Sequence, residues 1–140
     1  MLAYKLINPP IIAALSGAGH GAKVLIADSN YPASTKIGPN AELVYLNLTP
    51  GMPSATDVLK SLLDAIEVES AAVMQPDSGN DPDIFAEFTQ TLPKNVEMKR
   101  LGRFEFYDAV TDPDTCLVIQ TGEQRLYANL LLTLGAIAPK

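Results

Sequence analysis

The chain contains a single histidine, His20, which glycines surround in the run Gly17-Ala-Gly19-His20-Gly21-Ala22. An imidazole can both donate and accept a proton near neutral pH, so His20 is a candidate general acid or base. The neighbouring glycines would let a ligand approach the backbone closely. The same run also suits a solvent-exposed loop histidine without a chemical role, and the residues alone leave both interpretations open.

The glycine run also fits the pattern of a dinucleotide-binding loop. Such a loop must follow a strand and open a helix, so that the helix N-terminus meets the pyrophosphate. Here the order is reversed, because a helix is predicted before the glycines and the apolar run from Lys23 to Asp28 is typical of a buried strand. We therefore do not expect a nucleotide site. Gly17 and Gly19 should lie just past the helix end, where left-handed backbone angles favour glycine.

Three further polar side chains are candidates for facing a ligand. Asp28 ends the predicted strand, a usual place for such a group in α/β folds, although an aspartate that opens a turn is about as common there. Arg103 and Tyr107 are four residues apart in a predicted helical turn, so they should project on the same side. Phe104 should then turn toward the core.

A fourth candidate region lies near the C-terminus. Tyr127 and Asn129 alternate with Ala128 and Leu130 in a stretch predicted to be a strand, so the phenol and the amide should share one face. Sugar hydroxyls need both donors and acceptors, which tyrosine and asparagine supply. The pattern suits a sugar site but does not establish one.

A metal site or a disulfide is not expected. Zinc normally needs three or four Cys, His or carboxylate ligands, and the chain has one histidine and one cysteine. Cys116 begins an apolar run, so we expect it to be buried in a protein of a reducing compartment, the cytoplasm. The N-terminal residues do not have the pattern of a targeting segment, and no stretch has the roughly 20 apolar residues of a membrane helix.

The bulk composition limits the partners. At 140 residues the chain is expected to form one domain, residues 1–140. A net charge of −6 provides no positive surface for nucleic acid or an anionic membrane, so neither is expected as a partner. Apolar residues make up 47% and charged residues only 19%, which leaves apolar surface for another subunit to cover.

Strand and helix patterns alternate along most of the chain. Capping patterns predict helix starts at Asn8, at Ser54 and at Asp81-Pro82-Asp83, and a further short helix is predicted at 104–107. Strands are predicted at residues 23–28, 42–47, 71–74, 96–101, 116–120 and 127–133. This alternation favours an α/β fold, a three-layer α/β/α sandwich with a mixed, mostly parallel sheet. The last two strands are expected to form an antiparallel pair, because only a short connection separates them.

Four ordered blocks of the sequence resemble a known family. They are Gly19-His20-Gly21, "ADSNYPA" from Ala27, "RFEFY" from Arg103, and Thr121-Gly-Glu123 followed by Tyr127-Ala-Asn129. Together, from about residue 5 to the C-terminus, they are similar to the D-ribose pyranase and L-fucose mutarotase family. "RFEFY" and "NYPA" resemble the fucose branch, whereas "LTPGMPS" and "YANLLL" resemble the ribose branch, so the resemblance leans to fucose.

The resemblance implies an enzyme that interconverts the cyclic forms of a free monosaccharide by acid–base ring opening and closure, with no cofactor. His20 stands where the family has its proton donor, and Tyr107 where the fucose branch has a tyrosine that acts in catalysis. The implied sugar-binding residues are Asp28, Arg103, Tyr127, Ala128 and Asn129, of which Ala128 can offer only its backbone or its shape. Family members form ring-shaped homo-oligomers, commonly decamers, with the sugar near a subunit contact. The alternative is a non-catalytic sugar-binding accessory protein of sugar uptake.

Two departures from the family pattern bear on the choice of sugar. Position 22 is alanine where the fucose branch usually has an acidic residue. The acid that this branch carries before its third strand has three candidate counterparts here, Asp64, Glu67 and Glu69.

The strand between His20 and Asp28 raises a geometric difficulty. Five extended residues separate its ends by about 17 Å. The two side chains can share a small sugar only if the glycine loop doubles back or a neighbouring subunit supplies one of them.

Overall fold

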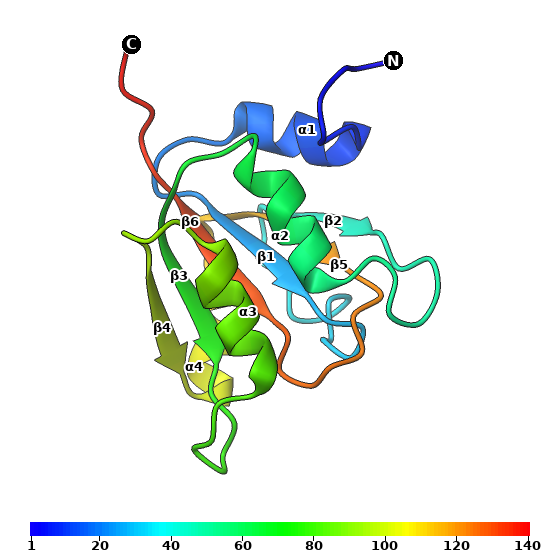
Figure 1. Cartoon of the computed structure of the whole chain (residues 1–140), viewed down its shortest axis with the longest axis vertical. Coiled ribbons are helices and arrows are strands. Elements are labelled where there is room, and N and C mark those ends of the chain that lie inside the picture. The colour runs from blue at the N-terminus through cyan, green and yellow to red at the C-terminus, as the bar shows by residue number, and fades with distance from the viewer.

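The computed structural model describes all residues from Met1 to Lys140 (Figure 1). Helices and strands alternate, and the six strands form one sheet in the spatial order β2-β5-β1-β6-β3-β4. In chain order the elements are α1 (Pro9–Gly17), β1 (Lys23–Ala27), β2 (Glu42–Tyr45), α2 (Ala55–Leu63), β3 (Val68–Met74), α3 (Asp83–Thr91), β4 (Glu97–Leu101), α4 (Arg103–Val110), β5 (Thr115–Gln120) and β6 (Leu130–Leu134).

Strand β6 is the only strand that runs against the others. Strand β5 is parallel to β1 and β2, β3 is parallel to β4, and β6 lies between β1 and β3, antiparallel to both. The expected antiparallel pair of the last two strands is therefore wrong, because β1 lies between β5 and β6. A direct hairpin is impossible here, since the connection must cross the end of β1. The segment from residue 121 to 129 makes this crossing.

Helices cover both faces of the sheet. Ile11 of α1, Leu59 of α2 and Phe88 of α3 belong to one apolar cluster, while Phe106 and Val110 of α4 belong to a second cluster. In Figure 1, α2 and α3 lie in front of the sheet and α4 lies behind it. The predicted three-layer sandwich with a mixed, mostly parallel sheet is confirmed.

The central strand shows how the sequence builds these two layers. Val24 and Ile26 of β1 pack in the first cluster, and Leu25 and Ala27 pack in the second. All four side chains are fully buried. A strand that is buried on both faces has a continuous run of apolar residues instead of alternating apolar and polar ones, and β1 has such a run.

Two of the three predicted helix caps are present. The backbone N–H of Ile11 donates to Oδ1 of Asn8 at 3.1 Å, and that of Asp57 donates to Oγ of Ser54 at 3.1 Å. The third helix start is confirmed, since α3 begins at Asp83, but its expected side-chain cap is wrong, because the N-cap is Pro82, which has no side-chain acceptor. Asp81 instead accepts a hydrogen bond from Nε of Arg100 in β4, at 2.9 Å.

Three other expectations are corrected. Phe104 is 76% exposed rather than buried, and the core position on α4 belongs to Phe106. Cys116 is only half-buried. The positive φ in the glycine run falls on Gly21, at 85°, and not on Gly17 or Gly19, because the turn between α1 and β1 lies at His20 and Gly21.

Candidate functional site

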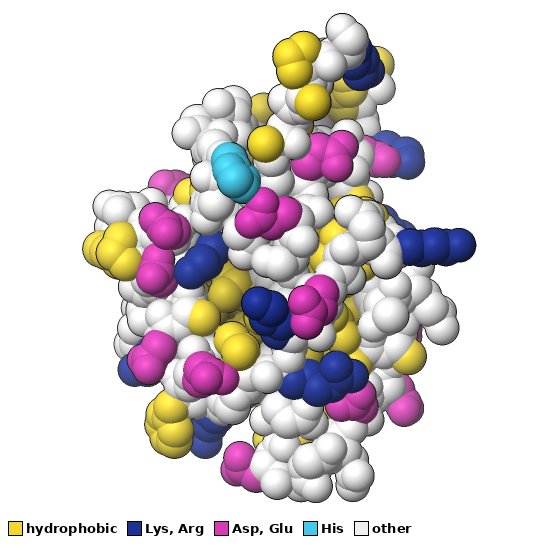
Figure 2. All heavy atoms as spheres, turned by 90° about the vertical axis from the view of Figure 1, so that its left-hand side faces the viewer, with side chains coloured by type: hydrophobic (Ala, Val, Ile, Leu, Met, Phe, Trp, Pro, Cys, Tyr) yellow, Lys and Arg dark blue, Asp and Glu magenta, His cyan; other side chains and the backbone are white.

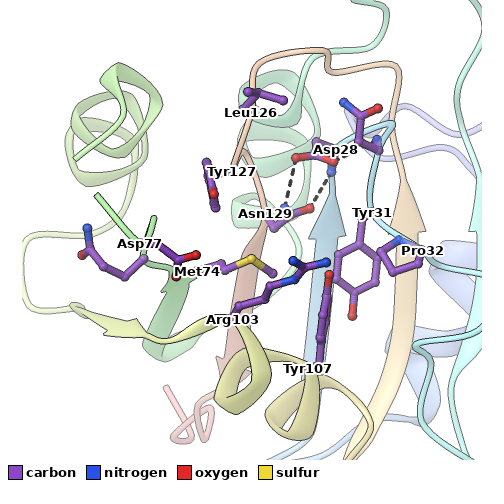
Figure 3. Close-up of a pocket in the computed structure, with 12 residues that line it drawn as sticks. Asp28, Tyr31, Pro32, Met74, Asp77, Arg103, Tyr107, Leu126, Tyr127 and Asn129 are labelled. Carbon is purple, nitrogen blue, oxygen red and sulfur yellow. Dashed lines mark hydrogen bonds between the residues drawn. The ribbon is translucent and has the colours of Figure 1, made fainter. Parts of the chain in front are cut away.

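A pocket of about 290 Å³ opens where the ends of three neighbouring strands meet (Figure 3). Strands β1 and β3 end there, and β6 begins there because it runs the other way. The N-terminus of α4 forms another wall. Ligand sites of open α/β sheets typically lie at this edge of the sheet. The lining residues are Asp28, Asn30, Tyr31, Pro32, Met74, Gln75, Asp77, Arg103, Tyr107, Leu126, Tyr127 and Asn129.

Asp28 and Asn129 form the base of the pocket. The backbone N–H of Asp28 donates to Oδ1 of Asn129 at 2.8 Å, and Nδ2 of Asn129 donates to Oδ2 of Asp28 at 3.0 Å. Burial raises the pKa of Asp28 above its ordinary value, while hydrogen bonds from the chain and from Asn129 act in the opposite direction. The pair is a rigid hydrogen-bonding platform with carboxylate lone pairs left for a ligand.

Tyr127 reaches the pocket from a turn and not from a strand. Strand β6 begins at Leu130, and Tyr127 has a φ of 61°, the only positive φ outside glycine. The prediction that Tyr127 and Asn129 alternate along a strand is therefore wrong, although both line the pocket. Ala128 between them is fully buried in the core and does not line the pocket.

Helix α4 contributes a cation and an aromatic ring. Arg103 is its first residue and Tyr107 follows one turn later, so both face the pocket as the spacing predicted (Figure 3). The guanidinium carbon of Arg103 lies 5.7 Å from the centre of the Tyr107 ring. The neighbouring Tyr107 hydroxyl raises the pKa of Arg103 further above its ordinary value.

Tyr31 is a pocket residue that the sequence did not single out as a site residue. Its ring meets that of Tyr107 edge to face, with centres 5.8 Å apart, and its hydroxyl donates to the carbonyl oxygen of Lys36 at 3.0 Å. Burial raises the pKa of this hydroxyl, so the phenol stays protonated. Its place in the turn that follows β1, three residues after Asp28, was the available signal.

His20 lies outside this pocket. It precedes the first residue of β1, whereas the pocket lies at the strand's last residue. Its Nε2 is 2.6 Å from Oε2 of Glu69, in β3, and its side chain is 61% exposed. Figure 2 shows the histidine, in cyan, at the surface beside acidic side chains. The glycine loop therefore does not double back to Asp28. Of the three acidic candidates near β3, the structure brings Glu69 to His20.

The edge of the pocket carries exposed apolar side chains. Leu126 lines the pocket and is 66% exposed. Phe104 is also exposed, and its ring lies 6.4 Å from that of Tyr107. Large exposed apolar groups beside a polar pocket are typical of a surface that another protein covers.

No cluster of three or more histidine, cysteine or carboxylate side chains is arranged to hold a metal ion. Among the helices, none has both the length and the apolar character needed to span a bilayer.

Comparison of the sequence with known proteins finds one family over nearly the whole chain. The model of the RbsD / FucU transport protein family matches residues 1–137. Fucose mutarotase from Homo sapiens is 34% identical over 145 aligned residues, which cover 95% of this chain and 91% of that protein. D-ribose pyranase from Proteus mirabilis is 30% identical over 137 residues, covering 93% and 94%.

Solved structures with the same fold include two that hold sugars. RbsD from Bacillus subtilis complexed with D-ribose superposes with a TM-score of 0.85 at 25% identity and covers 99% of this chain and 100% of that chain. Fucose mutarotase from Streptococcus pneumoniae in complex with L-fucose gives a TM-score of 0.80 at 25% identity, with the same coverage.

Proposed function

Because the chain belongs to the RbsD / FucU transport protein family, we propose that it is a monosaccharide mutarotase, an isomerase of free sugars. The observation that carries the proposal is the pocket at the strand ends. It gathers a buried carboxylate, an amide, a guanidinium and phenols around a space of about 290 Å³. These groups supply the donors and acceptors that a polyhydroxylated ligand requires.

The proposed reaction needs only proton transfers. A base removes the proton of the anomeric hydroxyl, and an acid delivers a proton to the ring oxygen as its bond to the anomeric carbon breaks. The open-chain aldehyde then rotates about the bond to the next carbon and closes on its other face, which returns both protons. Nothing is oxidised and no group is transferred, so the chemistry has no need of a cofactor. Each positioned acid or base contributes on the order of 10² to 10⁴ in rate.

We assign the sugar-holding role to Asp28, Arg103, Tyr127 and Asn129, with Tyr107 as one acid–base group. Arg103 donates only, the Asp28 carboxylate accepts, and the two phenols do both. Ala128 contributes through its shape alone, since its side chain is buried in the core. The assignment is supported by the pocket, which all of these residues except Ala128 line.

His20 is proposed to act on the pocket of a neighbouring subunit. Within one chain, β1 separates His20 from Asp28, and the imidazole is exposed beside Glu69. The apolar side chains of Phe104 and Leu126 at the pocket edge offer a surface that a second copy can cover. A contact that joins these different ends of two copies is heterologous, and we propose that it closes into a ring, with a decamer as the proposed size.

Glu69 is proposed to orient the imidazole. A carboxylate that accepts a hydrogen bond from Nε2 leaves Nδ1 of His20 as the nitrogen that exchanges a proton with the sugar.

The proposed substrates are L-fucose, D-ribose or a similar neutral aldose. Fucose is favoured by the 34% identity to a fucose mutarotase over nearly the whole of both chains. The proposed compartment is the cytoplasm, supported by the single free thiol of Cys116.

Saturation-transfer NMR on a panel of fucose, ribose, galactose and xylose tests this function. The wild-type protein should speed anomer exchange of at least one sugar over buffer. The His20→Ala variant should lose at least about 100-fold of that rate while it still binds the sugar. Equal exchange by the variant would overturn the role of His20. Sugar binding without any exchange by the wild type would instead favour a non-catalytic accessory protein of sugar uptake.

A further inference from the structure

A buried carboxylate lies just before Leu126 and Tyr127, which line the pocket from the segment that precedes β6. The side chain of Glu123 is 5% exposed. Its Oε1 accepts from the backbone N–H and from Nε of Arg125, both at 3.0 Å. Its Oε2 accepts from Nη2 of Arg125 at 2.9 Å and from the backbone N–H of Ala55 at 3.2 Å. The carboxylate is therefore fully occupied by donors, one of them the N-terminus of α2.

Arg125 extends this cluster to a third element. Its Nη1 donates to Oε1 of Glu87 in α3 at 2.6 Å, and the hydroxyl of Thr56 in α2 donates to Oε2 of the same carboxylate at 2.9 Å. One guanidinium thus bridges two carboxylates, with a forked contact to Glu123 that lysine cannot reproduce. The cluster ties the chain at residues 123–125 to α2 and α3.

The carboxylate of Glu123 stays ionised. Burial by itself raises the pKa of Glu123, but the hydrogen bonds from Arg125 and from the backbone of Ala55 outweigh it and lower the pKa below the ordinary value. An ionised carboxylate held by a guanidinium makes a stronger and better directed contact than a neutral pair.

The segment from residue 123 to 129 is held at its other end as well. Asn129 is fixed by its two hydrogen bonds with Asp28. Between the two fixed ends, Tyr127 has a φ of 61° and lines the pocket. A non-glycine residue keeps this conformation only where the surrounding structure enforces it, and such residues cluster at functional sites.

We propose that Glu123 and Arg125 are positioning residues of the sugar site, which fix the chain so that Tyr127 keeps its left-handed conformation and faces the pocket. The expected effect on sugar affinity rests on the proposed function. The expected effect on the conformation of Tyr127 does not. Neither side chain lines the pocket. They act through Tyr127, so they should influence sugar binding more than the proton transfers of the bound sugar.

The Arg125→Lys variant tests the proposal, because it keeps the charge and loses the forked contact. The half-saturating sugar concentration should rise roughly tenfold, with the exchange rate at saturating sugar nearly unchanged. Arg100→Lys is the matched control, since Arg100 also makes a forked contact, to Asp81, and neither of these side chains lines the pocket. It should lower thermal stability less, because this ion pair is exposed, and it should leave sugar affinity unchanged.

A second readout does not depend on the sugar. In NMR spectra without ligand, the backbone and ring signals of Tyr127 should shift and broaden in Arg125→Lys but not in Arg100→Lys. Unchanged Tyr127 signals and unchanged sugar affinity, with only a lower melting temperature, would overturn the positioning role and leave a merely stabilising one. If the wild type exchanges no sugar, the proposed function fails, and the Tyr127 signals still decide the inference.

Discussion

At the scale of single residues, the pair of Asp28 and Asn129 sets the charge at the base of the pocket. The Asn129 amide donates to the Asp28 carboxylate and accepts from the Asp28 backbone N–H, and Asp28 is 3% exposed. Burial raises the pKa of Asp28 in the folded protein. A carboxyl whose pKa is raised by folding favours the folded state below its ordinary pKa. That contribution is lost as the pH rises through the raised value.

The Asn129→Asp variant should magnify this pH dependence. Two carboxylates would face each other at hydrogen-bond distance, which raises the pKa of the pair and makes the charged form costly. We expect a loss of about 2–3 kcal/mol in the free energy of unfolding at pH about 8 and a smaller loss at pH about 5. Urea unfolding at both pH values measures this loss in the free energy of unfolding. Asn40→Asp is the control, at an exposed amide that donates to a carbonyl, and a loss equal to that of Asn129→Asp at either pH would contradict the account.

The residues of the pocket were predictable to different degrees. Arg103 and Tyr107 share a face because helical spacing alone requires it. Tyr31 was not expected as a site residue, because its role depends on a turn that folds back over the strand end. The wrong placement of Phe104 has a similar cause, since the outward face of a short helix depends on what it packs against.

At the scale of elements, the crossing segment from β5 to β6 places Leu126, Tyr127 and Asn129 at the pocket. It passes the end of β1 and packs against the turn that precedes α2. A Cβ added at Gly122 would collide with the backbone carbonyl oxygens of Met52 and Thr49. The glycine is therefore required by close approach of two backbones rather than by a left-handed angle.

Replacement of this glycine gives a direct prediction. Gly122→Ala should lower the free energy of unfolding by roughly 1–3 kcal/mol, because two backbone segments must move apart. Gly17→Ala is the matched control, since an added Cβ there meets nothing within 4 Å. Thermal unfolding of both variants measures the difference. Equal melting temperatures for the two variants would show that the turn is free to move.

Local patterns predicted most elements, but not how the last strand pairs. Caps at Asn8 and Ser54 follow from side chains within three residues, and the buried strand β1 follows from its apolar run. The insertion of β6 between β1 and β3 depends on contacts between segments far apart in the chain. The left-handed conformation of Tyr127 has the same origin, so no local pattern signalled it.

At the scale of the whole molecule, the candidate site residues lie at two opposite ends of the chain's central strand. The pocket lies at the carboxyl ends of β1 and β3, and His20 lies beyond the other end of β1. The structure keeps the two ends apart, so the proposed role of His20 requires that a neighbouring subunit bring them together. The surplus of apolar residues, 47% of the chain, is consistent with such an assembly.

Anomer exchange in mixed oligomers tests the central claim most directly. His20→Ala chains keep the pocket, and Asn129→Ala chains keep the imidazole, so each variant alone should be inactive in saturation-transfer NMR. When the two are coexpressed with different tags and purified as mixed assemblies, about a quarter of the sites should combine an intact pocket with an intact His20. The account predicts that a corresponding share of wild-type exchange returns. Exchange no faster than that of the separate variants would contradict it.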